Sequence, residues 1–237
     1  MNIVITGASK GIGLAIAEKF SQDNEKHSFV LCSRSAHNIN NAAEQLRKNY
    51  PLHAYHTIAC DVGDEQQVLA FAKFCKETLD STDILVNNAG FGIFKPVVEF
   101  SLNEFQSVLD TNLRGVFLVT RELLPPMRAK KSGTIITIAS LAAKNGFSGG
   151  AAYCASKYAV RGLMNCLFLE VRNDNIRCIT IFPGSVDTAF YDNVPSSIAK
   201  AKMLLASEIA ESVWSATHLP IGATVSEIDI RPTNPKG

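Results

Sequence analysis

The sequence predicts an α/β fold: a doubly wound parallel sheet of seven strands with helices on both of its faces. Short runs rich in Val and Ile, typical of strands buried on both faces, recur along the chain. Stretches with helical periodicity separate these runs, and such alternation favours a parallel sheet covered on both sides. The 237 residues contain no internal repeat, low-complexity tract or linker, so we expect one domain over 1–237.

Strands are expected at seven short runs: 3–5, 29–33, 54–60, 83–86, 134–140, 177–182 and 228–230. Helices are expected at 14–20, 38–49, 64–79, 101–126, 153–171 and 207–218. The helix at 101–126 starts at a capping box formed by Ser101 and Glu104 and is expected to reach a break at Pro125-Pro126. Residues 185–206 show little periodicity, which indicates a mobile loop or short helices over a site.

The composition argues against several classes of partner and location. A net charge of +1 gives no reason to expect nucleic acid or an anionic membrane as a partner. No apolar run approaches the ~18 residues of a membrane span, and no signal peptide is recognisable. The six cysteines form no C-x-x-C pair, which favours reduced thiols and a cytoplasmic location. The histidines show no metal-ligand spacing, so no metal is expected, and His53 and His56 are interpreted as a strand-edge pair.

The ends of the predicted strands carry the candidate site. In parallel sheets of this kind, ligands bind in a crevice at the carboxyl ends of the strands. Six polar or turn-forming residues fall at those ends: Thr6, Arg34, Asp61, Asn87, Ser140 and Pro183. This coincidence predicts a dinucleotide-dependent enzyme.

The first strand–helix junction carries a glycine-rich turn from Thr6 to Gly13. Glycines at 7, 11 and 13 would let the backbone approach a pyrophosphate, which would rest on the helix N-terminus. The alternative is an ordinary glycine-rich turn. Arg34 ends the second strand, at the position where an acidic residue would bind the ribose of NAD. An arginine there favours the 2′-phosphate of NADP, and Lys10 adds a second cation. Both could instead be solvated surface charges.

The stretch from Ser140 to Lys157 holds the candidate reaction chemistry. Tyr153 and Lys157 are four residues apart, so on a helix they are neighbours. A lysine cation favours the phenolate form of a nearby tyrosine, so the pair could exchange a proton with a substrate oxygen. Ser140 would hydrogen-bond the same oxygen from the end of its strand. The alternative is an exposed tyrosine–lysine pair on a solvated helix face.

The chain resembles the short-chain dehydrogenase/reductase family, in its NADP-preferring subtype, over essentially its whole length. Five motifs carry the resemblance, in chain order: T-G-x-x-x-G-x-G at 6–13, N-N-A-G at 87–90, N-x-x-G at 112–115, Y-x-A-S-K at 153–157 and P-G-x-V-x-T at 183–188. The resemblance implies a single-domain Rossmann fold and an NADP(H)-dependent oxidoreductase acting on a small carbonyl or alcohol. It also implies pairing into a homodimer or homotetramer.

The resemblance also implies roles for individual residues. Tyr153 would be the acid/base, Lys157 would tune it and hold the nicotinamide ribose, Ser140 would polarise the carbonyl, and Asn112 would anchor a water in the proton relay. The implied cofactor contacts are Gly7, Ser9, Lys10, Gly11, Ile12, Gly13, Arg34, Asp61, Val62, Asn88, Ala89, Gly90, Tyr153, Lys157, Pro183, Gly184, Val186 and Thr188.

The substrate side is expected to be apolar and aromatic, lined by Phe91, Phe94, Phe147, Phe190 and Tyr191, with Ile198 in the same loop. The ending Glu227 to Thr233 is similar to that of bacterial sepiapterin reductase-like members, whereas 3-oxoacyl-carrier-protein reductases share nearly all the motifs. Two further alternatives stay open: a non-catalytic NADP(H)-binding redox sensor, and an NAD-dependent alcohol dehydrogenase working in the oxidative direction.

Overall fold

The computed structural model describes residues 1–190, 200–220 and 222–234. Seven strands form one sheet in the order β3-β2-β1-β4-β5-β6-β7, and every neighbouring pair is parallel. Their bounds are β1 Asn2–Thr6, β2 Ser28–Ser33, β3 Ala54–Ala59, β4 Ile84–Asn87, β5 Gly133–Ile138, β6 Ile176–Pro183 and β7 Glu227–Ile230. The chain order reverses beside β1, where β2 and β4 flank it, and this is the position at which doubly wound sheets bind ligands.

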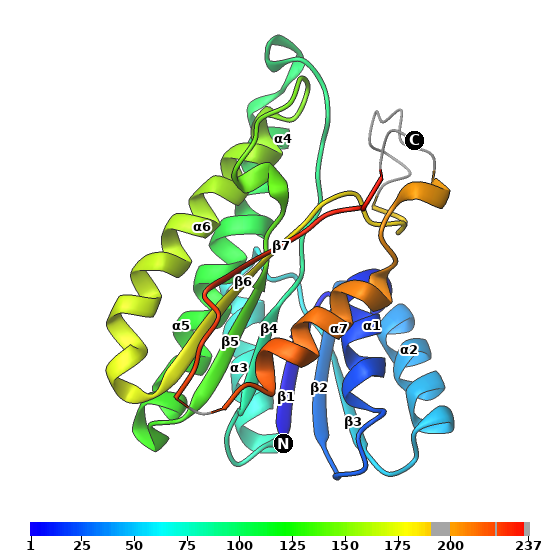
Figure 1. Ribbon diagram of the computed structural model, residues 1–237, viewed down its shortest axis with the longest axis vertical. Coiled ribbons are helices and arrows are strands. Elements are labelled where there is room, and N and C mark those ends of the chain that lie inside the picture. Colours follow the sequence, from blue (N-terminus) through cyan, green and yellow to red (C-terminus); the bar gives the residue numbers. More distant parts are fainter. Residues whose placement is uncertain (191–199, 221, 235–237) are drawn as a thin grey trace.

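Helices cover both faces of the sheet, as Figure 1 shows. One buried apolar cluster joins the sheet to α1 (Gly11–Phe20), α2 (Ala36–Asn49) and α7 (Ala206–Thr217). A second cluster on the other face joins it to α3 (Glu65–Thr78), α5 (Gly115–Lys130) and α6 (Ala151–Val171). Because both faces of the sheet are covered, the inner strands are buried along nearly their whole length rather than alternating, whereas the edge strands β3 and β7 are only partly buried. The predicted single-domain, doubly wound Rossmann fold is confirmed.

The helix predicted at 101–126 differs from the structure in two ways. It is divided into α4 (Leu102–Leu109), a π-helical segment over Asp110–Arg114 and α5. Pro125 and Pro126 do not end it, because α5 continues to Lys130. Both prolines lie on the exposed side of α5, where carbonyl groups that lose their N–H partner can bond to water. The buried face of α5 meanwhile packs on the sheet, so tertiary contacts override the local helix-breaking signal.

The predicted capping box at the start of α4 is present. The Ser101 hydroxyl accepts the N–H of Glu104 at 3.2 Å, and the Glu104 carboxylate accepts the N–H of Ser101 at 2.9 Å. The same carboxylate forms an ion pair with Lys95 at 2.6 Å, and the N–H of Lys95 bonds the carbonyl of Gly149 at 2.9 Å. These contacts join the loop after β4 to the loop before α6.

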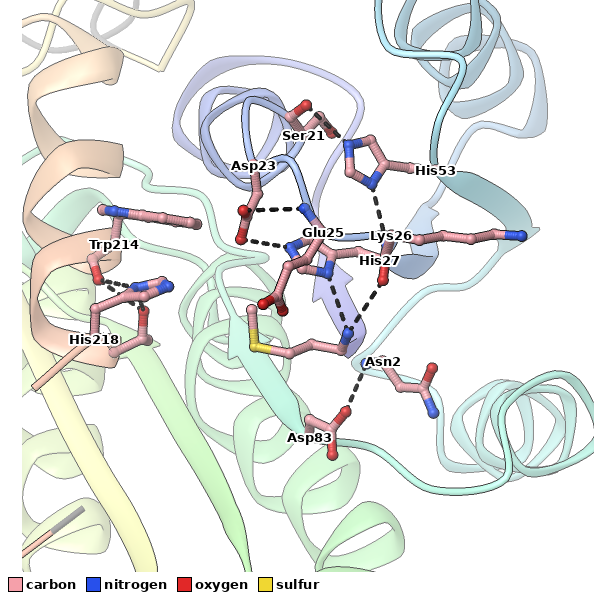
Figure 2. A network of polar contacts seen from close by, with 12 residues as sticks. Asn2, Ser21, Asp23, Glu25, Lys26, His27, His53, Asp83, Trp214 and His218 are labelled. Carbon is pink, nitrogen blue, oxygen red and sulfur yellow. Dashed lines mark hydrogen bonds and ion pairs between the residues drawn. The ribbon is translucent and has the colours of Figure 1, made fainter. Parts of the chain in front are cut away.

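A histidine pair is buried beneath the amino end of the sheet, as Figure 2 shows. His53 stacks on His27 rather than pairing with His56, with ring centroids 5.3 Å apart. The Nδ1 atom of His53 accepts the N–H of His27 at 3.1 Å. His27 itself lies between the Asp23 carboxylate at 3.0 Å and the N-terminal ammonium at 3.1 Å. The prediction of a strand-edge pair was wrong, because the turn after α1 brings His27 beside the residue that precedes β3.

Within the described ranges, no helix combines the length and the apolar character that crossing a membrane requires.

Candidate active site

A cavity of about 710 Å³ opens at the carboxyl ends of the strands. Four of the six predicted strand-end residues line it directly: Arg34, Asp61, Ser140 and Pro183. The other two act from behind its wall. The Thr6 hydroxyl accepts the N–H groups of Asn88 and Ala89, at 3.0 and 3.1 Å. The Asn87 amide donates to the Thr120 hydroxyl of α5 at 2.9 Å. Both side chains therefore fix the wall of the cavity without facing it.

The glycine turn forms one wall of this cavity. Gly7 and Gly11 have positive φ values of 65° and 60°, a region that costs other residues free energy. A Cβ atom on Gly7 would lie 2.8 Å from the Cα atom of Ala89, and one on Gly13 would lie 2.5 Å from the Asn88 amide nitrogen. The turn can therefore be close-packed against Asn88 and Ala89 only without side chains at these positions. Gly13 supports the turn from behind, whereas Gly7 and Gly11 line the cavity.

One end of the cavity lies over β2. Lys10 and Arg34 both line it and are exposed, so their charges face solvent and the cavity. Ser35 and Asn38, which sequence reasoning missed, line the same end. The Ser35 hydroxyl accepts the N–H of Asn38 at 3.2 Å and so caps α2. Its position immediately after Arg34 and before a helical run could have identified Ser35 from the sequence.

Phe91 lies apart from the other phenylalanines that were expected on the substrate side. The Arg34 guanidinium lies 5.7 Å from the centroid of its ring, within the range of a cation–π contact. The main chain of Phe91 is held by Asn112, which accepts its N–H at 3.0 Å and donates to its carbonyl at 2.9 Å. Phe91 therefore belongs with Arg34 at the β2 end of the cavity.

Tyr153 and Lys157 face the cavity from the first turns of α6, and Ser140 faces it from the end of β5. Lys157 Nζ lies 5.7 Å from the centroid of the Tyr153 ring and donates to the carbonyl of Ile138 at 2.9 Å. Lys157 is only 6% exposed. This burial lowers the pKa of Lys157 to about 8. The arrangement excludes the alternative of a solvated tyrosine–lysine pair.

Asn112 lies behind these residues, fully buried in the π-helical segment. Besides its two hydrogen bonds to Phe91, its amide donates to the Ser156 hydroxyl at 3.0 Å. Ser156 in turn donates to the carbonyl of Tyr153 at 2.7 Å. Asn112 thus links the loop after β4 to α6, which excludes a surface role for this side chain. Its role as the anchor of a water stays a prediction.

Two phenylalanines lie beside the Tyr153 ring, and a third lies beside one of them. Ring centroids of Phe94 and Phe190 lie 5.6 and 5.4 Å from that of Tyr153, and Phe147 lies 5.9 Å from Phe94. Tyr191 and Ile198 fall outside the described residues. Asn145 and Arg231 also line the cavity and were not predicted. None of the five family motifs contains either one.

The remaining predicted cofactor contacts, apart from Gly13, also line this cavity: Ser9, Ile12, Val62, Asn88, Ala89, Gly90, Gly184, Val186 and Thr188. A doubly wound sheet with a glycine turn, two cations at one end and a Ser–Tyr–Lys constellation at the other defines an oxidoreductase of the nucleotide-binding class. The model of the short chain dehydrogenase family matches residues 1–198, and the chain belongs to this family.

Relatives and solved structures agree with this assignment. A sepiapterin reductase of Chlorobaculum tepidum is 34% identical in an alignment of 237 positions that covers 98% of this chain and 96% of the relative. An alcohol dehydrogenase from the archaeon Thermococcus sibiricus, solved with 5-hydroxy-NADP, is 30% identical with a TM-score of 0.90, covering 100% of this chain and 98% of the other. A metagenomic short-chain oxidoreductase solved with NADP is 31% identical with a TM-score of 0.84, covering 98% and 97%.

Proposed function

We propose that this protein is an NADPH-dependent reductase of a small carbonyl compound, with Tyr153 as the proton donor. One observation carries the proposal: Ser140, Tyr153 and the buried Lys157 line the same cavity as the glycine turn and the two cations at its far end. A cofactor and a substrate could therefore meet in one space. The alcohol dehydrogenase and the metagenomic oxidoreductase that share the fold were both solved with NADP or a derivative of it, which supports the cofactor assignment.

The residues present fit the cofactor. Gly7 and Gly11 present bare backbone to the cavity, where a pyrophosphate could approach the turn, and a Cβ atom on Gly11 would meet only Thr188, at 3.5 Å. Lys10 and Arg34 would hold the 2′-phosphate, and Lys157 the ribose hydroxyls. When bound, NADPH supplies a hydride, two electrons and one proton, to the carbonyl carbon.

The chain's own residues would handle the second proton. The Ser140 hydroxyl would donate a hydrogen bond to the carbonyl oxygen and so polarise the C=O bond. The Tyr153 hydroxyl would transfer its proton to that oxygen as charge develops there, which completes the alcohol. The Lys157 ammonium would stabilise the phenolate that remains. The phenylalanines around Tyr153 would exclude water, which strengthens these interactions.

The proposed acid is tested by Tyr153→Phe, with Tyr158→Phe as the matched control. Tyr158 lies on the same helix and is 47% exposed. NADPH oxidation is followed with a panel of diketones, acetoacetyl esters and pteridines. We expect Tyr153→Phe to lose roughly 10²–10⁴-fold in kcat, the range attributed to general acid catalysis, and the control to keep its activity. Equal activity in both variants would reject Tyr153 as the proton donor. NADPH binding by the wild type without any turnover would instead favour the redox sensor.

Reduction of a pteridine is the second candidate, because the sepiapterin reductase of Chlorobaculum tepidum is similar over almost the whole chain. The pteridines in the same panel test it directly. Cofactor choice is tested separately with Arg34→Ala. We expect this variant to weaken NADPH binding and to leave NADH binding unchanged. Tighter binding of NADH than NADPH by the wild type would establish an NAD-dependent enzyme instead.

We also propose self-association through α4, α5 and α6. Exposed apolar side chains occur on these helices, among them Leu102, Phe117 and Leu169, which are 77, 44 and 60% exposed. Exposed apolar surface of this kind marks interfaces when it is contiguous. Size-exclusion chromatography with light scattering measures the subunit number, and Phe117→Glu is expected to shift it toward the monomer. A monomeric wild type would refute the proposal.

A further inference from the structure

We propose that Arg231 determines substrate specificity, and that the preferred substrate is an oxo acid, whose carboxylate Arg231 binds. The inference rests on the proposed function, since it names the substrate class of the same cavity. Arg231 lies directly after β7 and lines the cavity that holds Ser140, Tyr153 and Lys157.

The backbone on both sides of Arg231 is fixed against this cavity. The carbonyl of Ile230 accepts the N–H of Gly184 at 2.8 Å. A Cβ atom on Gly184 would lie 3.1 Å from the Cδ atom of Pro232 and 3.4 Å from a methyl carbon of Leu141, the residue that follows the catalytic serine. Arg231 therefore lies beside the end of β5 and the turn after β6.

The carboxylates around Arg231 neutralise its positive charge only in part. Arg161 binds Glu227 through two hydrogen bonds, at 2.7 and 3.0 Å. Lys144 pairs with both Glu227 and Asp229, at 2.8 and 2.6 Å. The contact from Arg231 to Asp229 is longer, at 3.3 Å. Three cations thus share two carboxylates. Arg231 is the cation among them that lines the cavity, and its side chain is 56% exposed, so its guanidinium keeps donors for a ligand.

The charged side chains in the cavity lining make the end near Tyr153 and Arg231 complementary to an anion. In the described part of the chain, the charged side chains that line the cavity are Lys10, Arg34, Asp61, Lys157 and Arg231. Asp61, the single carboxylate among them, follows β3 at one edge of the sheet, whereas Arg231 follows β7 at the opposite edge. The reacting end therefore offers two cations without a lining carboxylate. Guanidinium binds carboxylate through two parallel hydrogen bonds, which adds geometric specificity.

The aromatic wall indicates the rest of the substrate. Phe94 and Phe190 lie next to Tyr153, Phe147 lies next to Phe94, and the three rings would pack against an apolar or aryl group. An aryl or alkyl oxo acid would place its carboxylate at Arg231 and its apolar group against the phenylalanines. A pteridine presents amino and ring N–H donors on its pyrimidine edge, and the guanidinium of Arg231 has no acceptor for them. Pteridine reduction is therefore the competing outcome.

The test uses phenylglyoxylate and 3-benzoylpropionate, each with its methyl ester as the uncharged control, together with sepiapterin. Initial rates with NADPH give kcat/KM for the wild type, Arg231→Met, Arg231→Lys and the charge control Arg172→Met, which changes an exposed arginine after α6. We expect Arg231→Met to lose ~10–100-fold in kcat/KM for at least one acid, the range expected for a hydrogen bond to a charged group. Rates with the esters should change less than ~3-fold and should show that the variant is folded. Arg231→Lys should recover part of the loss, and Arg172→Met should resemble the wild type.

Calorimetric binding of the same acids separates the two proposals. Binding of an acid that depends on Arg231, without turnover of any carbonyl, would uphold the carboxylate site and refute the reductase. Turnover of the acids and esters with equal efficiency, unchanged by Arg231→Met, would overturn the carboxylate site and uphold the reductase. Efficient reduction of sepiapterin but neither acid would overturn it in favour of a pteridine. Absence of both binding and turnover of the acids would also overturn it.

Discussion

The ammonium group of Lys157 donates a hydrogen bond to the carbonyl of Ile138, 2.9 Å away, and so connects α6 to the end of β5 two residues before Ser140. Lysine is rarely buried without a carboxylate partner, because removing its charge from water costs free energy. The chain tolerates this cost at the position where the charge would serve the reaction. The free-energy cost of burying Lys157 can be measured.

Lys157→Met is expected to stabilise the protein without cofactor while abolishing its activity. The folded pKa of about 8 lies below the ordinary 10.5, which corresponds to a burial cost of about 3 kcal/mol at pH 7. Loss of the hydrogen bond to Ile138 offsets about 1 kcal/mol. Because the folded pKa is depressed, the wild type regains this stability as the pH rises from 8 to 10.5, and the variant does not. Urea unfolding at pH 7 and pH 10 measures both effects. A variant less stable than the wild type at pH 7 would contradict this account.

The glycine turn predicts opposite effects for two glycine-to-alanine substitutions. A Cβ atom on Gly13 would lie 2.6 Å from the carbonyl oxygen of Gly7, which the turn cannot move, so Gly13→Ala should cost about 1–3 kcal/mol and weaken NADPH binding. Gly162, within α6, has no atom within 4 Å of its added Cβ, so Gly162→Ala should stabilise by about 0.5–1 kcal/mol. Chemical denaturation of both variants provides the comparison, and similar effects would refute the packing argument.

The buried histidine pair predicts loss of stability in mild acid. Burial, and the ammonium group of Met1 facing it, lower the pKa of His27 below 6.5, although Asp23 opposes this. His53 stacks on the same ring. The folded state then binds fewer protons than the unfolded state, so stability falls as the pH drops through 6.5, by at most about 1.4 kcal/mol per pH unit for one proton. Thermal unfolding between pH 7.5 and 5 should show a shallower dependence for His27→Gln. An unchanged slope would exclude His27 as the titrating group.

The cysteines predict selective alkylation. All six lie within the described residues, and Cys166 is the one whose side chain is exposed. Burial raises the pKa of both Cys75 and Cys178 to about 12, so these thiols should be inert near neutral pH. Iodoacetamide followed by mass spectrometry should give one rapid adduct, and Cys166→Ser should remove it. Rapid labelling of a buried cysteine would show that the native core opens on that timescale.

The fold class could be predicted because its signal is local and repeated. Apolar runs and intervening helical periods identify strands and helices, and their alternation favours a parallel sheet. Three of the five family motifs, at 6–13, 87–90 and 183–188, begin at strand ends, whereas those at 112–115 and 153–157 lie on helices that pack beside these ends. The end of the helix predicted at 101–126 could not be located from the sequence. Pro125 and Pro126 carry a helix-breaking signal that only the packing of α5 on the sheet overrides.

The sequence by itself determined the individual strands and helices, the glycine turn and the spacing of Tyr153 and Lys157, since each is signalled by residues close together in the chain. The tertiary structure decided what lies beside them. It buried Asn112 in a π-helical segment, placed Phe91 beside Arg34, paired His53 with His27, and brought Arg231 into the lining of the cavity that also holds Tyr153. Such contacts join residues far apart in sequence, so their formation depends on the packing of the whole sheet rather than on any local pattern.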